Sequence, residues 1–168
     1  MTRKACPSEE KLDAAVVDSS ALISIAKGEP AAPSFLREMG NAGKLYISAP
    51  THAEVMLATM SVQARGAVDA MEGLIAALKI ETIGFGGDDI PAYTNAAMKY
   101  HLKAKPSGPL NMGDVFSFQL AVKMNLPLFF QGKDFLRTPV KNAMAMLGYE
   151  MNEKNLGVPT KTGSPSGQ

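Results

Sequence analysis

Residues 110–130 read LNMGDVFSFQLAVKMNLPLFF, and this stretch combines the two patterns that decide the fold. Its first part, Asn111 to Met124, places apolar side chains at helical spacing and predicts an amphipathic helix. Its second part, Leu126 to Phe130, is a short continuous apolar run, which is typical of a strand buried on both faces. A helix that leads into a fully buried strand is typical of an α/β domain.

The same alternation extends through the rest of the chain. Further strands are predicted at residues 14–17, 45–48 and 79–85. Helices are predicted at residues 21–26, 33–39, 50–60, 65–78, 88–104, 111–124 and 140–147. Strands that alternate with helices predict an α/β fold with a mostly parallel central sheet and helices on both of its faces.

One such domain is expected to span residues 13–150. Residues 1–12 form a polar N-terminal extension that mixes charges and lacks the apolar core of a signal peptide. Residues 151–168 end in a segment rich in Gly, Pro, Ser, Thr and Lys, and they are predicted to be a disordered C-terminal tail.

Composition excludes several classes of protein. The net charge of +1 gives no strong overall field, so any binding of nucleic acid must depend on a local basic patch or on metal. A single cysteine, Cys6, excludes a disulfide framework and a Cys-based zinc site. No apolar run approaches the roughly 18 residues that a membrane span needs. A cytoplasmic protein that does not enter a membrane is therefore expected.

Four acidic residues are predicted to lie at one edge of the sheet. Asp18 directly follows the first strand, and Asp134 follows the strand at residues 126–130. Glu54 lies near the start of the helix after the second strand. Asp114 begins a crossover helix, whose N-terminus is at the same edge because such a helix runs antiparallel to its strands. Open α/β sheets build their binding sites at this carboxyl edge.

Each acid also has a purely structural alternative. Asp18 could cap the helix that follows it. Residues 51–54, Thr-His-Ala-Glu, match a capping box. Residues 111–114, Asn-Met-Gly-Asp, are similar, with Asn111 as the cap and an acid in the first helical turn, where it favours the helix dipole. Asp134 could lie in a turn after Gly132. Taken one at a time, the acids leave both interpretations open, and it is their shared edge that favours a common site.

Carboxylates that converge on one place repel one another, and a bound divalent cation offsets that repulsion. Oxygen ligands without His or Cys suit Mg²⁺ or Mn²⁺ and not zinc. Such an ion activates a water molecule and neutralises charge on a phosphate group. The four acids therefore predict a metal site for the hydrolysis of phosphodiesters.

Several sequence blocks, in this order and spacing, resemble the PIN-domain ribonucleases and, within them, the VapC-type toxins of prokaryotic toxin–antitoxin pairs. The blocks are VVDSSALI at 16–23, GEP at 28–30, ISAPTHAE at 47–54, LNMGDVFSFQLA at 110–121 and LPLFFQGKDF at 126–135. The resemblance implies a PIN-like three-layer α/β/α sandwich, RNA cleavage that depends on Mg²⁺ or Mn²⁺, a homodimer and inhibition by a VapB-type antitoxin protein.

The resemblance also assigns roles to individual residues. It implies that the metal ligands and catalytic residues are Asp18, Glu54, Asp114 and Asp134, and that Ser20 supports the site. Family members often carry Thr-Asp shortly after the Asp-Phe pair, where this chain has Thr138-Pro139, so an accessory acid is missing.

Two other classes of function can be compared with this one. A phosphatase of the haloacid dehalogenase kind needs Asp-x-Asp after the first strand, and here Ser20 stands in the second position. A PIN-like module that binds RNA or protein without catalysis is the alternative that keeps the fold. The cations Lys99, His101, Lys103 and Lys105 could contact RNA phosphates or simply stabilise a solvated helix terminus.

Overall fold

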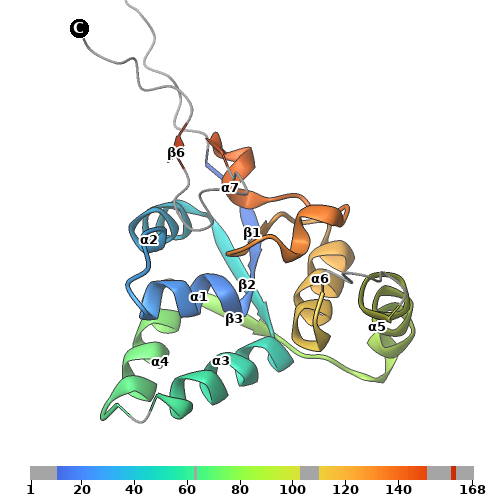
Figure 1. The fold of residues 1–168 in the computed structure, drawn as a ribbon, viewed down its shortest axis with the longest axis horizontal. Coiled ribbons are helices and arrows are strands. Elements are labelled where there is room, and N and C mark those ends of the chain that lie inside the picture. The colour runs from blue at the N-terminus through green and yellow to red at the C-terminus, as the bar shows by residue number, and fades with distance from the viewer. Residues whose placement is uncertain (1–10, 63, 103–109, 151–159, 162–168) are drawn as a thin grey trace, which may run out of the picture.

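A computed structural model of the chain describes residues 11–62, 64–102, 110–150 and 160–161 (Figure 1). The strands of the main sheet are β1 (Ala14–Val17), β2 (Lys44–Ser48), β3 (Ile80–Ile83) and β4 (Leu128–Phe129). The α-helices are α1 (Ser19–Ala26), α2 (Ala32–Asn41), α3 (Ala49–Ser61), α4 (Ala67–Ala77), α5 (Ile90–Ala97), α6 (Met112–Met124) and α7 (Ala143–Met146). Each predicted strand and helix in this part of the chain is thus present.

Shorter elements connect these. A 3-10 turn at Gly87–Asp89 precedes α5, a π-helical turn at Met98–Leu102 follows it, and a 3-10 turn at Asp134–Arg137 follows β4. Two residues of β5 (Tyr149–Glu150) pair antiparallel with two residues of β6 (Thr160–Lys161). Of the predicted N-terminal extension only residues 11–12 are described, and of the predicted C-terminal tail only residues 160–161. The domain limits therefore stay a prediction.

The main sheet is parallel throughout and has the strand order β3-β2-β1-β4. The chain first builds outward from β1 to β2 and β3, and then returns through α5 and α6 to place β4 on the other side of β1. The strand order therefore reverses at β1, with Val17 opposite Phe129 at the carboxyl end. Such a switch point is where an open parallel sheet leaves a crevice for a ligand.

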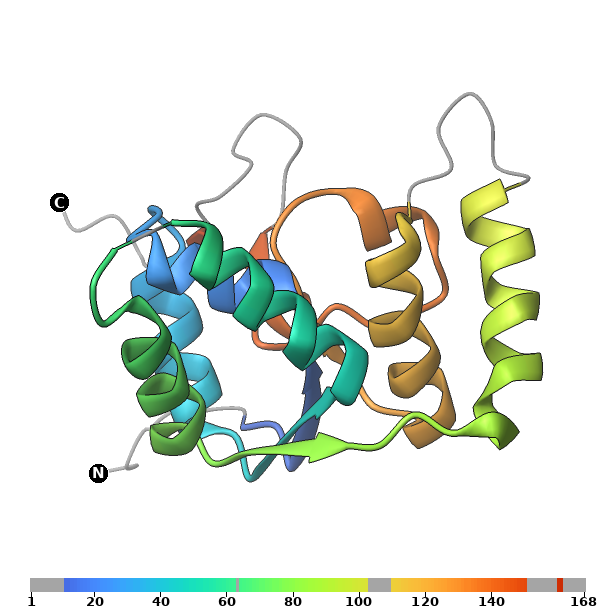
Figure 2. The ribbon, with the colours of Figure 1, turned by 90° about the horizontal axis from the view of Figure 1, so that it is seen from below.

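Side chains alternate across the central strand and fill two separate cores. Ala15 and Val17 belong to a core with α1, α2, α4 and α7, while Val16 belongs to a core with α5 and α6. Figures 1 and 2 show α1 to α4 gathered on one side of the sheet and α5 and α6 on the other. The predicted three-layer α/β/α sandwich is confirmed, because burial on both faces is what the continuous apolar strands require.

Helix α6 differs from its prediction in one respect. The sequence predicts that it is amphipathic, but its buried residues lie around most of its circumference, and they are Asp114, Val115, Ser117, Phe118, Gln119, Leu120 and Ala121. The physical reason is its position, because α6 contacts α5, α3 and the strands β1 and β2. The polar members of this set therefore need partners inside the protein.

None of the described helices is long and apolar enough to span a membrane.

Candidate active site

Asp18 occupies the switch point of the sheet and is 1% exposed. It caps α1, and its Oδ2 accepts hydrogen bonds from the Ser20 backbone N–H at 3.0 Å and from the Ser20 hydroxyl at 2.5 Å. Its other oxygen, Oδ1, is buried without a hydrogen-bond partner in the described part of the chain. Burial raises the pKa of Asp18, although the hydroxyl groups of Ser20 and Ser117 oppose the shift. Asp18 is therefore both a helix cap and a desolvated carboxyl with one oxygen unused.

Glu54 lies one turn into α3 and does not cap that helix. Ser48 is the N-cap, since its hydroxyl accepts the Thr51 backbone N–H at 3.2 Å, so the predicted capping box at residues 51–54 is wrong. The helix begins at Ala49, three residues earlier than a Thr51 cap requires. The Glu54 Oε2 atom is buried and has no hydrogen-bond partner among the described residues. Burial, and then the Asp18 carboxylate, raise the pKa of Glu54.

Asp114 lies in the first turn of α6 and is 7% exposed. The predicted capping interaction with Asn111 is confirmed: Asp114 Oδ2 accepts the Asn111 N–H at 2.7 Å, and the Asn111 side chain accepts the Asp114 N–H at 2.9 Å. Burial raises the pKa of Asp114 to about 7, with further contributions from the carboxylates of Asp18, Asp134 and Glu54. The charges of all three other acids therefore contribute to the raised pKa of Asp114.

Asp134 begins the 3-10 turn at Asp134–Arg137 and is exposed, unlike the other acids. It still lies close enough to Asp114 for its charge to help raise the pKa of that carboxyl. The structure therefore places Asp18, Glu54 and Asp134 within electrostatic reach of Asp114, with Asp134 on the solvent side.

Hydroxyl groups line the inner side of the acids. The Ser20 hydroxyl accepts the Gln131 N–H at 3.0 Å while it donates to Asp18, so it ties the end of β1 to the segment after β4. Behind Asp18, the hydroxyls of Ser48, Thr51 and Ser117 form a buried chain with oxygen separations of 2.7 Å and 3.1 Å. Thr51 and Ser117 were not predicted from the sequence to lie beside the acids, because their contact joins positions 66 residues apart.

We expect Thr51→Val to weaken this chain while keeping the side-chain volume. Thr51 is fully buried, so the substitution leaves the Ser117 hydroxyl without the Thr51 oxygen and costs on the order of 1–2 kcal/mol of unfolding free energy. Thr59→Val is the matched control: Thr59 lies in the same helix, is also buried, and its hydroxyl donates to the Val55 carbonyl of its own helix. Urea denaturation checks this, and equal losses in the two variants would contradict it.

The polar atoms of the site fit a hard divalent cation. Among the buried oxygens that have no hydrogen-bond partner in the described part of the chain are Asp18 Oδ1 and Glu54 Oε2, which belong to carboxylates, and Gln131 Oε1, which belongs to an amide. All four acids offer oxygen alone. In the described part of the chain, no three His, Cys, Asp or Glu side chains are already grouped as a set that could hold a metal ion. Mg²⁺ commonly uses one or two carboxylates and keeps several waters, so a pair of these acids meets its requirement.

The histidines of the described chain have structural partners. The His52 Nδ1 lies 2.9 Å from the Thr82 hydroxyl, and the His101 Nδ1 lies 2.8 Å from the Leu110 carbonyl oxygen. The Lys99 amino group lies 5.1 Å from the centre of the Tyr100 ring. The predicted cations Lys103 and Lys105 lie outside the described residues.

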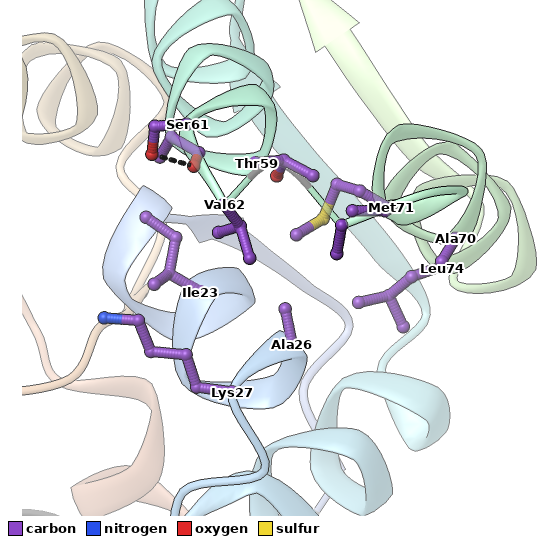
Figure 3. Close-up of a pocket in the computed structure, with 12 residues that line it drawn as sticks. Ile23, Ala26, Lys27, Thr59, Ser61, Val62, Ala70, Met71 and Leu74 are labelled. Atoms are coloured by element: carbon purple, nitrogen blue, oxygen red, sulfur yellow. Dashed lines mark hydrogen bonds between the residues drawn. The ribbon is translucent and has the colours of Figure 1, made fainter.

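A separate apolar pocket of about 520 Å³ lies between the ends of α1, α3 and α4 (Figure 3). Ile23, Val62, Met71 and Leu74 are among its lining residues, and Lys27 is its one charged side chain. None of the four acids lines it. The candidate site and this pocket are therefore different places on the protein.

Known proteins with a similar sequence indicate one family. A sequence model of the PIN domain family matches residues 15–141. A VapC ribonuclease of Mycobacterium bovis and ribonuclease VapC42 of Mycobacterium tuberculosis are each 27% identical over 129 residues, which is 76% of this chain and 98% of the relative.

Solved structures agree at the level of the fold. A toxin–antitoxin complex from Klebsiella pneumoniae superposes with a TM-score of 0.59 and 19% identity, covering 77% of this chain and 97% of that one. VapC20 of Mycobacterium tuberculosis, described as a toxin that cleaves the sarcin–ricin loop, superposes with a TM-score of 0.60 and 13% identity, covering 74% and 95%. The sheet order, the matched residues and these similarities lead to one conclusion: the chain belongs to the PIN domain family.

Proposed function

We propose that this protein is a metal-dependent endoribonuclease that hydrolyses RNA phosphodiesters, and that it is the toxin of a VapBC-type toxin–antitoxin pair. The observation that carries the proposal is that the charges of Asp18, Glu54 and Asp134 all act on Asp114, and that Asp18 and Glu54 each have a buried oxygen without a partner in the described part of the chain. A protein does not keep such groups desolvated and close together without cost, and a divalent cation removes that cost. The ribonuclease names of the curated VapC relatives support the choice of RNA as the substrate.

In this proposal Asp18 and Asp114 are the main ligands of Mg²⁺ or Mn²⁺, and Ser20 supports the site by holding Asp18 through its short hydrogen bond. When bound, the ion supplies positive charge next to the scissile phosphate and lowers the pKa of water. Asp18 is held in one orientation, because its Oδ2 is fixed by Ser20 while Oδ1 stays free for a ligand.

Glu54 and Asp134 complete the acidic pocket and hold or polarise the attacking water. The oxygen of that water forms a bond to phosphorus while the bond from phosphorus to the leaving ribose oxygen breaks. Glu54 is suited to accept a proton from the water, since burial and Asp18 raise its pKa. No side-chain nucleophile is needed.

The proposal includes a protein partner. Solved structures with this fold include toxin–antitoxin complexes, one of them from Klebsiella pneumoniae and one a VapBC2 assembly of Rickettsia felis bound to promoter DNA. We therefore propose a small VapB-type antitoxin as the inhibitor of this protein. The homodimer and the cytoplasmic location stay predictions.

Incubation of the purified protein with total RNA, followed by mapping of the cut ends, tests the function. We expect cleavage at defined positions with Mg²⁺ or Mn²⁺, and none when a chelator is present. Cleavage that a chelator does not affect would contradict the metal mechanism. Binding of RNA without cleavage under every metal condition would instead favour a non-catalytic PIN-like module.

A further inference from the structure

Gly113 lies in the first turn of α6, directly before Asp114, and its surroundings are unusual for a helical glycine. A Cβ atom built on Gly113 would lie 2.7 Å from Glu54 Oε2, 2.8 Å from Glu54 Oε1 and 2.9 Å from Glu54 Cδ. These separations are shorter than real Cβ contacts. The Glu54 carboxylate therefore occupies the space that any other residue at position 113 would fill.

The backbone does not require glycine at this position. Gly113 is not among the residues with a positive φ, so an alanine could adopt its conformation without strain. Within a helix, glycine is less stable than alanine, because it loses more backbone freedom on folding. Stability of α6 therefore does not explain the glycine at this position. The space that its missing side chain leaves for another group does.

The space over Gly113 is a favourable position for a carboxylate. The first turn of a helix has free backbone N–H groups and the positive end of the helix dipole, and both attract an anion. That attraction opposes the repulsion between Glu54 and the neighbouring acids, which adds to the effect of burial in raising the pKa values of Glu54 and Asp114. Helix α3 is held against α6 at this level by the Thr51–Ser117 hydrogen bond.

We propose that Gly113 is a positioning residue, whose missing side chain creates the seat that holds the Glu54 carboxylate beside Asp114. The inference rests on the proposed function, since it assigns Glu54 to the metal and water site. According to this inference, the spacing of α3 and α6 at this point accommodates the Glu54 side chain only because residue 113 is a glycine.

The test compares Gly113→Ala with Gly73→Ala in the full chain. Gly73 is the matched control, because it is an exposed glycine inside α4 and has no atom within 4 Å of a built Cβ. Without metal, we expect Gly73→Ala to raise the melting temperature by about 2–4 °C and Gly113→Ala to raise it less. In calorimetric titration with Mg²⁺, we expect about tenfold weaker binding for Gly113→Ala and an unchanged affinity for Gly73→Ala.

A second pair of variants separates positioning from a general loss of structure. Glu54→Asp withdraws the carboxylate by one methylene, so the space over Gly113 is no longer occupied. We expect Glu54→Asp and the double variant Glu54→Asp/Gly113→Ala to bind Mg²⁺ equally weakly, whereas independent effects would multiply. Multiplying effects would overturn the inference, as would equal gains in melting temperature for the two glycine variants.

The failure of the proposed function gives a different result. If the wild-type protein neither binds Mg²⁺ nor cleaves RNA, the proposed function is wrong, but the metal-free melting temperatures still decide whether Glu54 occupies the space over Gly113.

Discussion

Asp18→Asn is expected to lower the rate of RNA cleavage by a factor of about 100–1000 while the fold is retained. The loss follows from removing one negative charge from the metal site, a type of change that costs on the order of 3–4 kcal/mol in the transition state. The fold survives because an asparagine oxygen can still accept the two hydrogen bonds that Ser20 donates to Asp18, and because Asn is as good a helix cap as Asp.

Asp13→Asn is the matched control for this variant. Asp13 is an exposed acid immediately before β1, at the end of the strand opposite to Asp18. We expect it to cleave RNA at the wild-type rate. Initial cleavage rates at saturating Mg²⁺, together with thermal melting of both variants, check the prediction. Full activity in Asp18→Asn would exclude Asp18 as a metal ligand and with it the proposed mechanism.

The structural role that the sequence leaves as an alternative is present in Asp18 and Asp114, and it is compatible with the proposed ligand role. Each caps or stabilises a helix through Oδ2, as the structural alternative predicts. Capping uses only one carboxylate oxygen, so in Asp18 the other is left for a ligand. The local pattern could predict the cap, because the capping residues are two or three positions apart. It could not decide between cap and ligand, because the structure shows that the two are compatible.

The fold was largely predictable because its signals are local. Continuous apolar runs and helical spacing give the strands and helices, and the order of these elements places Asp18, Glu54, Asp114 and Asp134 on one edge. The features that sequence reasoning missed depend on contacts between distant elements. Examples are the Thr51–Ser117 hydrogen bond, the seat of Glu54 over Gly113 and the burial of α6 on most sides.

Asp114→Asn is expected to stabilise the metal-free protein at neutral pH, because it removes a buried charge that the neighbouring carboxylates oppose. The pKa of Asp114 is raised from 3.8 to about 7, so the folded protein binds a proton more tightly than the unfolded chain does. Stability of the metal-free protein should therefore fall as pH rises from about 4 to about 7 and then level off, by at most about 4 kcal/mol from this group. Asp18 and Glu54, whose pKa values are also raised, contribute in the same direction.

Metal reverses this dependence, since it binds only the deprotonated carboxylates. We expect the stabilisation by Mg²⁺ to be large at pH 8 and nearly absent at pH 5 in the wild-type protein, and to be small at both pH values in Asp114→Asn. Urea denaturation with chelator or with Mg²⁺ at several pH values measures both effects. Asp69→Asn, an exposed acid in the first turn of α4, is the control and should behave as wild type. Two results would contradict the prediction: a metal-free stability that rises between pH 4 and pH 7, or a stability that falls as much in Asp114→Asn as in the wild type. Either result would show that the Asp114 carboxylate is not the destabilising buried charge of the site.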